Sequence, residues 1–170
     1  SHYSTIQGLE QFLAQDELNL HFGGLLMGRL DLLVDRKVPA GNAFGAPMYI
    51  LEQLGFRKIV DTTFMIATMV PSNVNKSDVV KYFKALKRAQ ADIDLRHDLY
   101  THYYQKELPE RYQELADTRR FGPGERIVFE PYSEDIFDGT RKWVIEKNIF
   151  RDDKVGLVGY EDAVLSTARN

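Results

Sequence analysis

Cysteine is absent from this sequence of 170 residues. Its absence excludes a disulfide framework and any metal site built from thiolates, and it is compatible with every cellular compartment. Long apolar runs are also missing, since none approaches the roughly 20 residues that a membrane-spanning helix needs. The formal net charge is −3 and the pI is about 5.8. This acidic balance argues against nucleic acid as a partner.

The sequence also lacks the common catalytic signatures. It contains no GxSxG nucleophile elbow, no Walker loop, no GxGxxG fingerprint and no HExxH zinc motif. Of the four histidines, His97 and His102 are five positions apart, whereas metal ligands on one helix face are three or four apart. We therefore predict no enzyme site, no metal and no cofactor.

What the sequence does contain is typical of a soluble globular protein. Hydrophobic residues make up 44% of the chain and charged residues 28%. A chain of this length can bury the core of one ordinary domain.

Helical and β-prone segments alternate in the first half of the chain. Apolar residues at helical spacing predict a helix over 26–34 and another over 48–54, which Gly55 closes. Between and around them, residues 17–22, 38–43, 56–63 and 65–70 read as strands. This alternation predicts an α/β fold with a parallel-rich sheet flanked by helices.

The second half reads as mainly helical. Ser77 and Ser133 are predicted to cap helices, and Pro109 is predicted to break one or to open a new one. The helix after Ser133 is expected to end near Lys147 and Asn148, and a last short helix is expected over 160–168.

A candidate binding site lies at the start of the chain. Ser4 followed by Gln7 matches a capping box, and free backbone N–H groups with nearby hydroxyls can cradle an anion. Ordinary capping by Ser4 is the simpler reading of the same pattern. The residues assigned to this cradle are Ser1, His2, Tyr3, Ser4 and Thr5.

A second part of the site is expected at the end of the 38–43 strand. Ligands of open parallel sheets bind at the carboxyl ends of strands. There Asn42 would supply an amide and Phe44 an aromatic wall. We predict that these two residues and the cradle line one groove that holds a small molecule.

Three stretches, taken in order, resemble a known family. They are SHYSTIQGLEQFL, GRLDLLVDRKVPAGNAFGAP and LEQLGFRKIVDTTF, and the tail EPYSEDIFDGTRKWVIEKNIF continues the likeness. Together they look like the C-terminal portion, with the second lobe, of type 2 periplasmic solute-binding proteins of the nitrate/sulfonate/taurine and thiamine-precursor branch. Lys37 stands where that branch usually has glycine.

The resemblance implies one lobe of a two-lobed protein with extra C-terminal helices. Residues 1–75 would form the α/β core of the lobe, residues 76–124 its helical continuation, and residues 125–170 helices that pack on a first lobe. The apolar residues of those last helices would cover either that lobe or a second copy of the chain, which would make a homodimer.

The function implied by this resemblance is capture of a small anionic or polar aromatic solute by lobe closure, for an ABC-type importer. Its partners would be the solute and a membrane permease, in the periplasm or on an extracellular lipid anchor. Two alternatives stay open: an enzyme on the same scaffold, similar to a thiamine-pyrimidine synthase or a desulfinase, and a ligand-sensing domain of a regulator.

Overall fold

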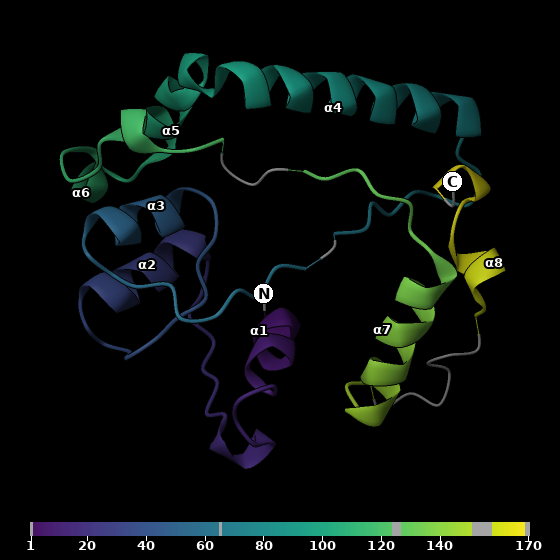
Figure 1. The fold of residues 1–170 in the computed structure, drawn as a ribbon, viewed down its shortest axis with the longest axis horizontal. Coiled ribbons are helices and arrows are strands. Elements are labelled where there is room, and N and C mark those ends of the chain that lie inside the picture. Colours follow the sequence, from purple (N-terminus) through teal and green to yellow (C-terminus); the bar gives the residue numbers. More distant parts are fainter. Residues whose placement is uncertain (1, 65, 124–126, 151–157, 169–170) are drawn as a thin grey trace. The chain divides into compact units, whose positions relative to one another are not determined.

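Every regular element in the described part of the chain is a helix. The computed structural model describes residues 2–64, 66–123, 127–150 and 158–168. Among these residues no helix is both long and apolar enough to cross a membrane. The helices are α1 (His2–Leu9), α2 (Leu26–Val34), α3 (Ala46–Gln53), α4 (Lys76–Arg96), α5 (Thr101–Glu107), α6 (Glu110–Gln113), α7 (Glu134–Glu146) and α8 (Tyr160–Ala163), with short 3₁₀ turns η1 (Gln15–Glu17), η2 (His97–Leu99), η3 (Thr118–Arg120) and η4 (Ser166–Ala168) (Figure 1).

The predicted α/β fold with a parallel-rich sheet is therefore wrong, because the described residues form no strand. The segments predicted as strands at 38–43 and 56–63 lie outside the helices, as does the described part of 65–70. Of the predicted strand at 17–22, Glu17 ends the 3₁₀ turn η1 and residues 18–22 lie outside the helices. A strand needs a neighbouring strand to satisfy its backbone N–H and C=O groups, and β propensity alone does not supply one.

The chain divides into two compact units. Unit 1 comprises Ser1–Val70 and Ala89–Arg126, and unit 2 comprises Pro71–Arg88 and Ile127–Asn170. Helix α4 contributes residues to both units. The division into three parts that the family resemblance implies stays a prediction.

Unit 1 is organised around α2 and α3, which lie side by side (Figure 1). Their apolar faces meet residues from the segment that begins at the end of α5 and runs through η3. Burial of such side chains contributes about 1.5–3 kcal/mol each. The buried residues of this core are Leu30, Leu33, Ile50, Leu51, Leu108, Tyr112, Ala116 and Phe121.

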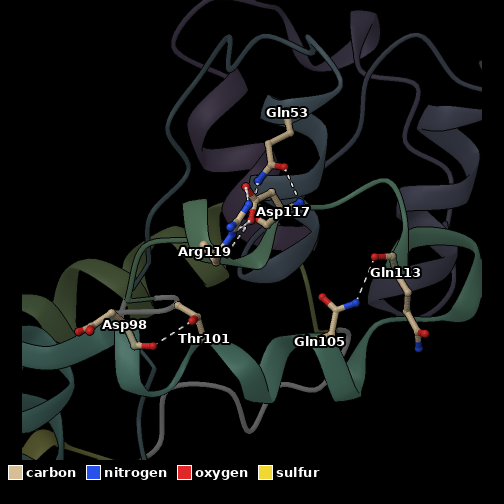
Figure 2. A network of polar contacts seen from close by, with 7 residues as sticks. All are labelled: Gln53, Asp98, Thr101, Gln105, Gln113, Asp117 and Arg119. Carbon is tan, nitrogen blue, oxygen red and sulfur yellow. Dashed lines mark hydrogen bonds and ion pairs between the residues drawn. The ribbon is translucent and has the colours of Figure 1, made fainter.

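Polar contacts from α3 and α5 fix the backbone at the end of α6 and in the segment after it. The amide of Gln53 on α3 donates to the carbonyl of Asp117 at 3.1 Å and accepts from its N–H at 2.9 Å (Figure 2). Gln105 on α5 donates to the carbonyl of Gln113 at 3.1 Å. Each of these bonds joins a glutamine side chain to main-chain atoms, so the bonds fix the backbone path at Gln113 and Asp117.

A charged clamp fastens α6 to α2 at the edge of the core. The buried Tyr112 hydroxyl donates to Asp31 at 2.5 Å, and Arg111 bonds both Asp31 at 3.2 Å and Asp35 at 2.5 Å. The hydrogen bond from Arg111 lowers the pKa of Asp35. Burial, together with the bond to Asp31, raises the pKa of Tyr112.

Three helices end in the same way, with a Schellman motif. At the end of α2, for example, the N–H of Arg36 bonds the carbonyl of Leu33 and the N–H of Lys37 bonds that of Leu32. The residue that turns the chain has a positive φ in each case: 55° for Arg36, 85° for Gly55 after α3, and 48° for Asn148 after α7. This conformation costs an ordinary L-residue about 1–2 kcal/mol, while glycine adopts it freely and asparagine tolerates it. Arginine is thus the unexpected residue of the three.

The ends of several predicted helices are confirmed. Helix α2 covers Leu26–Val34, Gly55 follows α3, Ser133 caps α7 by accepting from Ile136 N–H at 3.4 Å, and Pro109 stands between α5 and α6. Ser77 is not a cap, because α4 begins one residue before it. The carboxamide of Asn75 accepts the N–H of Ser77 at 3.0 Å and takes that role.

Unit 2 is held by aromatic contacts around α7 and α8. The ring of Phe137 lies 5.9 Å from that of Tyr160 and 6.4 Å from that of Tyr132. The Tyr160 hydroxyl donates to the carbonyl of Tyr132 at 2.6 Å. Helix α8 is therefore anchored by one buried tyrosine that packs and also hydrogen-bonds.

Candidate functional site

The predicted cradle falls on the first turn of α1. Ser1 lies outside the described residues. His2 and Tyr3 are exposed, with their rings 5.2 Å apart in an edge-to-face arrangement. Ser4 is buried, with 8% of its surface exposed, and Thr5 is half-buried.

Ser4 is therefore not the cap of α1, which was the reading of the capping box. The helix begins at His2, so Ser4 has helical backbone geometry. A cap must stand one residue outside the helix so that its hydroxyl can reach the free N–H groups. Ser4 sits inside and faces the interior of unit 1.

Asn42 and Phe44, in contrast, take part in a well-defined group of side chains. Arg29 comes from α2, Asn42 and Phe44 from the loop between α2 and α3, and Thr62 from the extended segment after α3. All four are half-buried. We call this group the Arg29 cluster. It takes Asn42 and Phe44 from the predicted site, and the residues at the start of α1 are not members of it.

The guanidinium of Arg29 is the centre of the cluster. Its Cζ lies 5.6 Å from the centre of the Phe44 ring, which is within the range of a cation–π contact. Its Nη1 lies 3.5 Å from both the backbone oxygen and the Oδ1 of Asn42. Those two distances are longer than the usual 2.7–3.2 Å of a strong hydrogen bond. The cation thus contacts both the aromatic face of Phe44 and the oxygens of Asn42.

The absence of a side chain at Gly23 leaves room for the aliphatic part of the Arg29 side chain. A β-carbon at position 23 would lie 2.8 Å from Cγ and 3.6 Å from Cδ of Arg29. Any larger residue would push the arginine stem away. The missing side chain of Gly23 therefore makes room for the cation.

Thr62 connects the cluster to α1. Its hydroxyl accepts from the Asn42 amide nitrogen at 3.0 Å, and so sets the direction in which the amide oxygen points. On its other side the threonine packs on Gly8 so closely that a β-carbon there would lie 2.5 Å from its Cγ2. Helix α1 thus supports the site through Gly8 in its C-terminal half.

Sequence reasoning missed Arg29 and Thr62. Arg29 is the one cation in the mostly apolar helical run at 26–34, and a single cation in such a run was the available signal. Thr62 gave no signal, because threonine is an ordinary residue in a β-prone segment.

The chemistry available to the cluster is recognition of an anion. A guanidinium presents donors in a planar fork that matches a carboxylate or a sulfonate. Charge-assisted bonds to such a group are typically 2.7–2.9 Å long. An anion would therefore bond Arg29 at shorter distances than Asn42 does. The flat face of Phe44 beside it suits a planar or aromatic ligand body.

Metal binding and similarity to known proteins were the two remaining sources of evidence on the site. The part of the chain that the structure describes holds no group of three or more His, Asp or Glu residues placed to bind a metal ion. No family model, curated protein or solved structure matches this chain.

Proposed function

We propose that this protein reversibly captures a small organic anion at the Arg29 cluster. The observation that carries the proposal is the position of Arg29, a half-buried cation over the face of Phe44 with Asn42 beside it. Such a site would bind an anion with directional bonds. This is the ligand class that the family resemblance implies, and Asn42 and Phe44 are now joined by Arg29 and Thr62.

Desolvation and a fixed orientation of the Arg29 side chain both favour binding of an anion. A half-buried guanidinium is less screened by water than an exposed one, so its attraction to an anion is stronger. The side chain is already held by Phe44 and Gly23, so little rotamer freedom remains to be lost on binding. A hydrogen bond to a charged group contributes about 1.5–3 kcal/mol, or roughly tenfold to a hundredfold in affinity.

Titration calorimetry with benzoate and benzenesulfonate tests the proposal, with benzamide as the uncharged match. We expect both anions to bind and benzamide to bind at least tenfold more weakly. Arg29→Gln should remove binding of the anions, and Arg29→Lys should restore only part of it because lysine lacks the planar fork.

The matched control for these variants is Arg57→Gln. Arg57 is an exposed cation in the same unit and lies outside the cluster. We expect this variant to bind benzoate as the unaltered protein does. Equal losses in the Arg57 and Arg29 variants would show that only net charge matters and would refute a specific site.

Transport is the biological setting that we propose for this capture, and it rests on the family resemblance alone. In that setting the protein would work outside the cytoplasmic membrane and deliver the solute to a permease. The test is binding of the purified, solute-loaded chain to membrane vesicles that carry a permease encoded beside its gene. Consumption of the solute over time, followed by NMR, would instead favour the enzyme alternative.

A further inference from the structure

A second candidate site lies in unit 1, where α2 and α3 end beside each other. A groove of about 560 Å³ opens between the two helix ends. This volume is within the range of pockets that hold small molecules. Leu33, Val38, Leu54 and Phe56 supply an apolar wall, and Arg36 and Lys37 supply two cations. No residue of the Arg29 cluster lines it.

The two helix ends that form the groove use the same Schellman turn with different residues. Gly55 turns the chain after α3, as the left-handed backbone favours, but Arg36 turns it after α2. A cation near a helix C-terminus is favourable in itself. That benefit does not require position 36, because Lys37 stands beside it with an ordinary backbone. The arginine at the disfavoured position thus calls for a role of its side chain.

The surroundings of Arg36 indicate what that role is. Lys37 pairs with Asp35 at 3.6 Å, and Asp35 is bonded at closer range by Arg111. The neighbouring carboxylate is therefore already shared by two cations. Leu54 and Phe56, each 37% exposed, add apolar surface to the same groove. Cations and exposed apolar side chains that line one groove complement a molecule with one anionic end and one apolar end.

We infer that the groove between the ends of α2 and α3 binds a small amphiphilic anion, with Arg36 holding the charged group and Leu54 and Phe56 packing on the apolar part. This site is independent of the Arg29 cluster. Arg36 lines the groove with a left-handed backbone that costs local stability, as strained residues at binding sites do.

The chain itself supplies the backbone-matched variant for the test. Asn148 turns the chain after α7 in the same motif and at a similar φ. Arg36→Asn therefore removes the cation and keeps a residue that tolerates the turn. Arg36→Gly removes the cation and relieves the backbone entirely. Both variants should fold, and the glycine variant should have the higher melting temperature.

The probe is octanoate, with 1-octanol as its uncharged match. Binding is followed by the amide chemical shifts of residues 33, 36–38 and 54–56, so that apolar contacts elsewhere on the chain do not contribute. We expect octanoate to shift these resonances, and both Arg36 variants to weaken its binding about tenfold. The weaker binding of 1-octanol should change by less than twofold. Leu54→Ser should weaken both probes, because it removes part of the shared apolar wall.

Three results would overturn the inference. Octanoate binding that survives Arg36→Asn would show that the cation has no role in it. A lower melting temperature in the glycine variant would show that the guanidinium serves the fold. Absence of shifts in the groove with either probe would remove the site itself. Arg29→Gln separates this inference from the proposed function, since it should abolish benzoate binding and leave octanoate binding unchanged.

Discussion

Replacing Gly8 with alanine sets two effects of opposite sign against each other. Alanine in a helix interior is more favourable than glycine by about 1 kcal/mol. The added β-carbon, however, would lie 2.5 Å from Cγ2 and 3.3 Å from Cβ of Thr62, and 3.5 Å from Cγ1 of Val60. Overpacking of this kind typically costs about 1–3 kcal/mol.

The stiffness of Thr62 decides which effect is larger. Threonine is β-branched and has few alternative rotamers, and its hydroxyl is already bonded to Asn42. To move away it must give up that bond, which contributes about 1 kcal/mol. We therefore expect Gly8→Ala to lower the free energy of unfolding by about 1–3 kcal/mol. Urea unfolding followed by circular dichroism is the measurement.

A double-mutant cycle identifies the responsible atom. Thr62→Ser removes Cγ2 and keeps the hydroxyl, so Gly8→Ala in that background should be neutral or stabilising by up to about 1 kcal/mol. Gly139→Ala in α7 is the matched control, because a β-carbon there meets nothing within 4 Å. It should stabilise the protein. Equal effects of the Gly8 substitution in both backgrounds would refute the reasoning, as would a stabilising effect of Gly8→Ala alone.

The core and its charged clamp permit three further predictions. Ile50→Ala, at a position with no exposed surface, should lower the free energy of unfolding by about 2–5 kcal/mol, measured by urea unfolding. Tyr112→Phe keeps the buried ring and loses the bond to Asp31, so it should lower the free energy of unfolding by only about 0.5–1.5 kcal/mol. A loss as large as that of Ile50→Ala would show that the hydroxyl does more than form this one bond. The lowered pKa of Asp35 contributes stability above its ordinary value of 3.8, and this stability is lost as the pH falls through the lower folded-state value. Acid unfolding should therefore be shallower in this range for Arg111→Gln, and an unchanged pH profile would count against the pairing.

Local features were predictable from the sequence because they depend on neighbours in the chain. Apolar residues at helical spacing identified α2, and Ser133 identified the start of α7. Gly55 was placed at the end of α3 because glycine adopts the positive φ of such a turn more readily than any other residue. Each of these depends on contacts within about four residues.

Pairing between distant segments was not predictable in this way. The β-prone stretch at 56–63 is indeed not helical, but whether it becomes a strand depends on a partner elsewhere in the chain, and the structure gives it none among the described residues. The parallel sheet was inferred from the alternation of helical and β-prone segments. That inference holds only if the β-prone segments pair with one another, and their pairing was assumed rather than predicted.

The candidate site shows the same limit. The sequence indicated Asn42 and Phe44 as a polar and aromatic pair at the end of a predicted strand. The strand is wrong, but the choice of the two residue types was a local observation. That Arg29 reaches them from 13 positions earlier, and Thr62 from 20 positions later, was decided only by the packing of unit 1. Residue types and spacing determine which local structures each segment favours, while the contacts between segments determine which side chains meet. The meeting of those side chains is what creates the site.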